Sequence, residues 1–124
     1  MAQQEQLNDF MNNLAEDING FIGASVVDLG TGMSLASISR VANFDLDVAA
    51  AYNSEMVKAK YNTIRALGIE GELQDMLLTL SDQLHLIRVL DNELFVYVAV
   101  NSAQSNLAIL RTMVNKNVAK YNLA

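Results

Sequence analysis

The sequence predicts an α+β protein in which a five-stranded antiparallel sheet lies between helices, a three-layer α/β/α arrangement. Apolar residues follow helical spacing at both ends of the chain and once in the middle, and short β-prone runs lie between these segments. Polar or glycine-containing turns separate neighbouring runs. The resulting order is helix, two strands, helix, three strands, helix, and we expect a single domain over residues 1–124.

The composition indicates a globular protein with enough apolar residues for a core. Of the 124 residues, 52% are hydrophobic and 18% are charged, and so high an apolar fraction in a small chain favours a subunit interface. The formal net charge of -6 argues against nucleic acid and anionic lipid as partners. The sequence has no cysteine, which excludes a disulfide framework and a cysteine nucleophile and fits a reducing compartment.

The ends and the apolar runs of the sequence predict a cytoplasmic protein without membrane insertion. The first residues lack the basic start and the continuous apolar stretch of a signal peptide. The longest apolar run, LFVYVAV at residues 94–100, is too short to span a bilayer.

The first predicted helix covers residues 4–17 and is followed by a predicted hairpin. Apolar residues at spacings of three and four place one apolar stripe on the helix. They are Leu7, Phe10, Met11, Leu14 and Ile18. Residues 24–29 and 33–38 are β-prone and are joined by Gly30-Thr31-Gly32, the pattern of a three-residue hairpin loop. A phosphate-binding glycine loop leads into a helix, whereas a strand-like segment follows here, so we interpret the glycines as a turn.

The longest predicted helix begins near Asp45 or Asp47, either of which can cap its N-terminus, and it ends at Gly68. Its apolar residues spread over much of the circumference. They include Leu46, Ala49, Ala50, Tyr52, Met56, Ala59, Ile64 and Leu67. A helix that is apolar beyond one stripe needs cover on more than one side, so we expect its own sheet and a second surface to contact it.

Three predicted strands and a helix complete the chain. The strands cover residues 76–80, 84–90 and 94–100, and the helix covers residues 105–120. Polar turns join the strands, namely Ser81-Asp82-Gln83 and Asp91-Asn92-Glu93. The last strand is apolar at consecutive positions, so we expect it to be buried on both faces near the centre of the sheet.

The element order and four stretches of sequence resemble the roadblock family. These stretches are GASVVDLGTGMSLAS, FDLDVAAAYNSEMVKAK, LLTLSDQLHLIRVL and LFVYVAVN. The family includes dynein roadblock light chains and bacterial regulators of small Ras-like GTPases, and the chain is most similar to its bacterial stand-alone branch. The resemblance covers essentially the whole chain and implies the three-layer roadblock-like (profilin-like) fold.

The resemblance also implies a homodimer in which the third strands of two subunits pair and the long helices pack beside the seam. The interface positions that it implies are Val48, Ala51, Tyr52, Glu55, Met56, Met76, Leu77, Leu78, Thr79 and Leu80. The implied function is a non-enzymatic module that regulates or scaffolds a small Ras-like GTPase or a signalling complex. A small-ligand sensor with a pocket between sheet and helix is the alternative.

No set of residues in the sequence points to catalysis, a cofactor or a metal ion, and we expect none of these sites. His85 is the only histidine, and no nucleophile or carboxylate is spaced to work with it. Glu70, Glu72 and Asp75 straddle a glycine-containing connection and are interpreted as a solvated acidic loop. If the chain activates a GTPase by donating an arginine, the candidates by residue type are Arg40, Arg65, Arg88 and Arg111.

Overall fold

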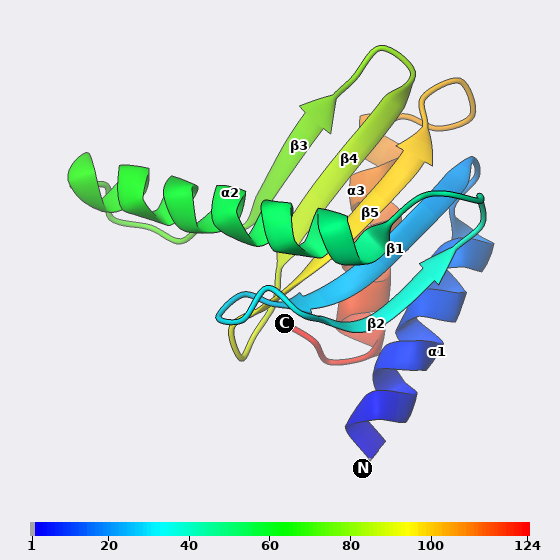
Figure 1. Ribbon diagram of the computed structural model, residues 1–124, viewed down its shortest axis with the longest axis horizontal. Coiled ribbons are helices and arrows are strands. Elements are labelled where there is room, and N and C mark those ends of the chain that lie inside the picture. The colour runs from blue at the N-terminus through cyan, green and yellow to red at the C-terminus, as the bar shows by residue number, and fades with distance from the viewer. Residues whose placement is uncertain (1) are drawn as a thin grey trace.

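The computed structural model describes residues 2–124 and has the predicted order of elements (Figure 1). These elements are α1 Ala2–Asp17, β1 Phe21–Asp28, β2 Ser34–Ser39, α2 Leu46–Ala66, β3 Asp75–Thr79, β4 Gln83–Val89, β5 Leu94–Asn101 and α3 Leu107–Lys120. The strands form one five-stranded sheet in the order β2-β1-β5-β4-β3, and every neighbouring pair is antiparallel. Helices α1 and α3 cover one face and α2 crosses the other, which confirms the α+β three-layer arrangement (Figure 1).

The core lies on both faces of the sheet, and β5 runs through its centre. All residues of β5 except Asn101 are buried, as its continuous apolar sequence predicts. Phe10 and Leu14 of α1 pack on one face with Val98, and Val57 of α2 packs on the other face with the neighbouring β5 side chains. Among the residues described, no helix is both long and apolar enough to cross a membrane.

Local capping explains where α2 begins and ends. Asp45 is the N-cap, and its carboxylate accepts hydrogen bonds from the backbone N–H groups of Asp47 and Val48 at 3.1 and 3.0 Å. At the other end Gly68 has a φ of +66°, the left-handed conformation that glycine adopts most readily after a helix. The predicted cap and the predicted stop are both confirmed.

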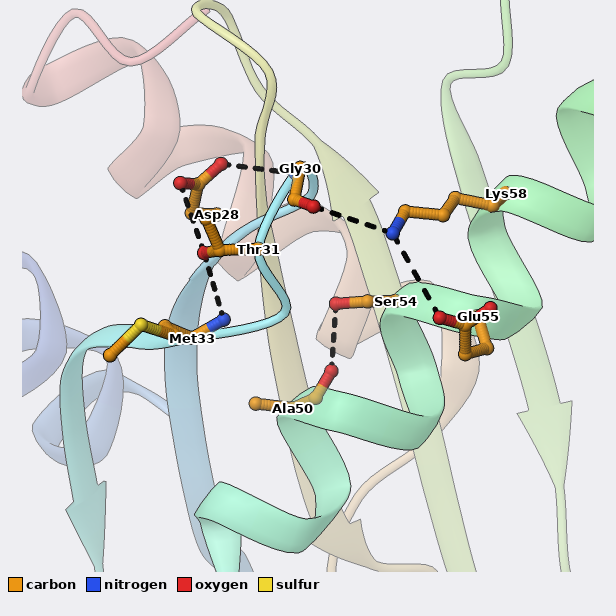
Figure 2. A network of polar contacts seen from close by, with 8 residues as sticks. All are labelled: Asp28, Gly30, Thr31, Met33, Ala50, Ser54, Glu55 and Lys58. Carbon is orange, nitrogen blue, oxygen red and sulfur yellow. Dashed lines mark hydrogen bonds and ion pairs between the residues drawn. The ribbon is translucent and has the colours of Figure 1, made fainter.

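The turn between β1 and β2 is longer than the predicted three residues, because residues 29–33 all lie outside the strands. The Asp28 carboxylate accepts hydrogen bonds from the Gly30 N–H and the Thr31 hydroxyl, each at 3.1 Å, and thereby organises the turn (Figure 2). Gly32 has a φ of +75° and lies against α2, where a Cβ atom would be 3.6 Å from Ser54 Oγ. The glycines therefore serve the turn and its packing.

The third strand is shifted by one residue from its predicted position. It begins at Asp75 and ends at Thr79, so the predicted strand residue Leu80 lies in the turn that follows. There its backbone N–H donates to Gln83 O at 2.9 Å.

The second half of α2 extends past the sheet. Its buried residues, Leu46, Ala50, Ser54 and Val57, all precede its last nine residues. Beyond Val57 the helix continues past β3, the edge strand, and projects from the body of the molecule (Figure 1). We call residues 58–66 the overhang of α2. Leu67, which follows it, is 67% exposed, so this end of the helix has apolar surface that its own sheet does not cover.

Candidate functional site

The edge strand β3 has backbone groups that point away from the sheet. Val89 N–H donates to Gln74 O and Leu80 N–H donates to Gln83 O, each at 2.9 Å. Because bonded and non-bonded residues alternate in an antiparallel pair, these two bonds show which residues of β3 bond to β4. The residues whose backbone groups point outward are therefore Asp75, Leu77 and Thr79. Within residues 2–124, no side chain hydrogen-bonds to these groups. The edge is open to another strand.

The opposite edge, β2, is partly covered. Arg40 N–H donates to Ile22 O at 2.8 Å, so the outward backbone groups belong to alternate residues of β2. They are Leu35, Ser37 and Ser39. The Gln4 side chain of α1, the helix beside β2, donates a hydrogen bond to Leu35 O at 3.0 Å (Figure 1). This contact occupies an acceptor that an incoming strand would need.

On the α2 side of the sheet, the end of β3 and the start of β4 present a surface that includes His85. Leu78 pairs directly with His85 and is half-buried, and Leu80 is 44% exposed. The His85 ring lies 3.1 Å from the Tyr97 hydroxyl through Nδ1 and 2.8 Å from Gln83 Oε1 through Nε2. Burial lowers the pKa of His85 from its ordinary value of 6.5 and raises the pKa of Tyr97 to about 12. Both rings are therefore neutral near pH 7.

The predicted interface residues of the helix lie mostly on its outer face. Val48 is 51% exposed and Tyr52 is 75% exposed. Ala51 and Glu55 are also exposed, whereas Met56 is half-buried. Met56 and Met76 both pack against the buried cluster on the α2 side of the sheet.

The predicted interface residues of the strand are divided between the two faces of the sheet. Met76 packs on the α2 side and Leu77 on the side of α1 and α3. Leu78 is half-buried, and Thr79 and Leu80 are exposed.

A groove beneath the overhang of α2 was not predicted from the sequence. It consists of two adjoining cavities of about 340 and 410 Å³. Both are lined by Leu29 of the β1–β2 turn, Tyr61 of α2 and Glu93 of the β4–β5 turn. Because three distant segments form the groove, no local pattern indicates it.

The acidic residues suggested by the sequence do not form a site. Glu70 and Glu72 are exposed, whereas the Asp75 carboxylate accepts two hydrogen bonds from the Arg111 guanidinium at 2.9 and 3.1 Å. In the part of the chain that the structure describes, no three metal-ligating side chains come together. The acidic loop is thus solvated except for Asp75, which joins β3 to α3.

The structure also separates the four arginines. Arg88 donates to Asn115 Oδ1 at 2.9 Å and Arg111 pairs with Asp75, so both make contacts within the fold. Arg40 and Arg65 are exposed. Among the described residues, the Arg65 guanidinium hydrogen-bonds only to Asn62 of its own helix, and Arg65 lines the groove.

Solved structures with the same architecture cover nearly the whole chain. MglB from Myxococcus xanthus is 16% identical with a TM-score of 0.86, and the match covers 97% of this chain and 87% of that chain. The gliding protein MglB from Thermus thermophilus is 14% identical with a TM-score of 0.80, covering 98% and 91% of the two chains. A roadblock/LC7 domain from Streptomyces avermitilis is 15% identical with a TM-score of 0.76, covering 95% and 98%.

No protein-family model and no curated protein matches the sequence. At identities of 14 to 16%, the likeness to the solved structures is one of fold. It confirms the fold that the resemblance in sequence implies.

Proposed function

We propose that this chain, which has the roadblock fold, is a non-enzymatic homodimeric module that regulates or scaffolds a small Ras-like GTPase or a signalling complex. A GTPase is proposed as the partner because the sequence resembles a family that includes regulators of such proteins. The homodimer is supported by one observation above all: an open edge strand lies beside a helix that overhangs it.

A second copy of the chain fits the open edge of β3. Two β3 strands related by a two-fold axis would run antiparallel and exchange hydrogen bonds through the outward groups of Asp75, Leu77 and Thr79. The sheet would then continue from one subunit into the other. Pairing would also remove an exposed apolar edge, which is otherwise a site of uncontrolled association.

The same two-fold axis gives the overhang of α2 a surface to cover. Each helix projects past its own β3 and would therefore reach over the sheet of the partner (Figure 1). Its apolar end, marked by Ile64 and Leu67, would meet the side of the sheet where Leu78 and Leu80 are incompletely covered. Burying these side chains is the main favourable term of such an interface.

The charges of α2 also suit antiparallel packing of two copies. Asp47 and Glu55 lie in the first part of the helix, and Lys58, Lys60 and Arg65 lie in the overhang. Antiparallel helices would place the acidic part of one beside the basic part of the other, which favours that orientation over a parallel one.

The outer face of α2 is a surface for the GTPase. Tyr52 is 75% exposed and Val48 is 51% exposed, and they lie one helical turn apart. An exposed aromatic residue beside an aliphatic one is a good anchor for a protein partner. Met56 is half-buried against the core, so the two helices can pack through the flank that bears Met56 and leave part of this outer face free.

The experiment that tests the dimer is light scattering over a dilution series. We expect a mass near twice 13.6 kDa. Leu78→Glu on β3 should shift the mass to that of one chain, because it buries a charge at the seam. Leu35→Glu on β2 is the matched control and should leave the dimer intact. A single-chain mass for the unchanged protein at every concentration would reject the dimer.

The GTPase is tested separately by affinity capture from the source cells and identification of the captured proteins. We expect the unchanged protein to recover a small Ras-like GTPase and Tyr52→Ala to lose it while remaining dimeric. Failure of the dimer to recover any GTPase would reject this partner without affecting the dimer.

A further inference from the structure

We propose that the groove beneath the overhang of α2 is a binding site for a small amphipathic anion, an apolar body that bears one carboxylate or a similar acidic group. The site uses residues outside the open edge of β3. It is an additional function and does not depend on the dimer or on the GTPase.

The deeper part of the groove is apolar. Its volume is about 340 Å³, and its apolar walls are formed by residues of α2, β4, β5 and the two turns. They include Leu29, Val57, Tyr61, Val89, Leu94 and Phe95. The adjoining cavity of about 410 Å³ opens toward solvent beside Gly30 and Asn62. These sizes fit small-molecule sites, which are mostly apolar with a few polar groups that orient the ligand.

Two cations stand at the mouth of the groove. Lys58 and Arg65 lie two helical turns apart on α2, and both line the outer cavity. Lys58 Nζ reaches across to Gly30 O at 3.5 Å, and its ion-pair partner, the exposed Glu55 carboxylate, is 3.9 Å away (Figure 2). Both distances are long, so the ammonium group can move to a better acceptor. Arg65 contacts no carboxylate in the described chain.

The charge at the mouth favours an anion. Glu93 is the acidic residue that lines both cavities. Of the charged residues that line the two cavities, two are positive and one is negative, and Glu55, the loosely held partner of Lys58, lies outside this lining. An acidic ligand group would therefore be bound at Lys58 and Arg65 while its apolar part enters the deeper cavity.

The groove and the proposed seam use opposite flanks of α2. Successive residues of a helix are rotated by about 100°. Lys58, Tyr61 and Arg65 therefore lie on one flank, and Lys60 and Leu67 lie on the other. A second copy packed against the latter flank leaves the groove open.

The size of the groove argues for a small ligand over a helical segment of a protein. An α-helix with its side chains is about 10 Å or more in diameter. The deeper cavity of about 340 Å³ lies between α2, two strands and two turns, and its volume suits a ring system or an alkyl chain.

The test uses two fluorescent probes on the full chain. One is 1-anilinonaphthalene-8-sulfonate, an aromatic anion, and the other is N-phenyl-1-naphthylamine, its uncharged analogue. Lys58→Gln and Arg65→Gln should each weaken binding of the anion about three- to tenfold, since each removes one charged contact. Glu93→Gln should strengthen it, and binding of the neutral probe should not change in these variants.

Lys60→Gln is the matched control, because it makes the same change of charge on the opposite flank of α2. The proposed site is wrong if Lys60→Gln weakens binding of the anionic probe as much as Lys58→Gln does. It is also wrong if neither Lys58→Gln nor Arg65→Gln changes that binding. Leu29→Trp places a larger side chain in both cavities. Loss of binding of both probes in this variant, with an unchanged melting temperature, would confirm that the probes bind in the apolar cavity. Decanoate should displace the anionic probe, and displacement by an acidic peptide at lower concentration would overturn the assignment to a small ligand.

Discussion

β2 and β3 both end the sheet, and each has three residues with outward backbone groups, yet their surroundings differ. At β2, the Gln4 side chain of α1 donates to Leu35 O, and the outward positions that follow are serines. At β3, no comparable donor is present in the described chain, and the outward position at mid-strand is Leu77. Strand length and propensity do not distinguish the two edges. Their neighbours do, because one edge has a helix beside it and the other has a helix that passes over it.

The largest expected difference between the edges comes from proline. Thr79→Pro and Ser37→Pro each remove one outward N–H, and edge strands tolerate proline. Thr79→Pro should raise the dissociation constant of the dimer by about 100-fold, because the two-fold axis makes the loss occur twice. Ser37→Pro should have little effect. Sedimentation equilibrium measures both, and equal effects would mean that the dimer does not form through β3.

The next largest effect is expected at the ion pair between β3 and α3, on the face of the sheet opposite α2. Arg111 makes a bidentate ion pair with Asp75, whose side chain is 18% exposed, while that of Arg111 is 49% exposed. Arg111→Gln should lower the free energy of unfolding by about 1 kcal/mol, a value reduced by solvent screening. Urea unfolding measures the change. Lys116→Gln on the same helix is the control, and an equal loss there would show that the ion pair is not responsible.

A pH effect is expected beside the β3 edge, where His85 of the neighbouring strand β4 pairs with Leu78, whereas β2 has no titratable side chain. Burial lowers the pKa of His85 below 6.5, so the unfolded chain binds more protons than the folded chain as the pH falls through that value. The stability that neutral His85 contributes is present above about pH 6.5 and is lost toward the lower folded pKa.

Denaturation from pH 7 to pH 5 tests this expectation. The unchanged protein should lose stability faster than His85→Gln, by less than about 1.4 kcal/mol per pH unit. Identical slopes for the two proteins would mean that His85 is not linked to folding.

The smallest effect is expected at the covered edge. Gln4→Ala leaves Leu35 O to water and should lower the free energy of unfolding by about 0.5 kcal/mol, without changing the mass of the assembly. Gln3→Ala removes an exposed side chain that makes no such contact and serves as the control. A loss above about 2 kcal/mol would indicate that the Gln4 contact anchors the whole of α1.

Much of the fold could be predicted because its signals are local. Residues at spacings of three and four identify α1, the Asp45 cap and Gly68 delimit α2, and the continuous apolar run of β5 places it at the sheet centre. The two errors in the strand bounds have different causes. Asp75 extends β3 at its start and is held by Arg111, 36 residues away. The β1–β2 turn has a local cause, because the Asp28 carboxylate accepts hydrogen bonds from Gly30 and Thr31 within the turn.

The candidate sites were predictable only in part. The spread of apolar residues around α2 indicated that the helix needs a second surface, and the exposure of Tyr52 and Leu67 agrees with that expectation. The contact of Gln4 with Leu35 joins residues 31 positions apart, so the sequence does not reveal which edge is covered. The groove could not be predicted, because its lining comes from α2 and from turns and strands that are distant in the sequence.

The overhang of α2 has a consequence for communication between the two sites. The fully buried residues of this helix end at Val57 and Tyr61 still packs against the core, so the end of the helix beyond Tyr61 acts as a lever. In the proposed dimer a second copy would rest on one flank of that lever, and a ligand in the proposed groove site would touch the other. A ligand that tilts it toward or away from the seam changes the affinity of one copy for the next. By thermodynamic reciprocity, self-association then changes the affinity for the ligand by the same factor.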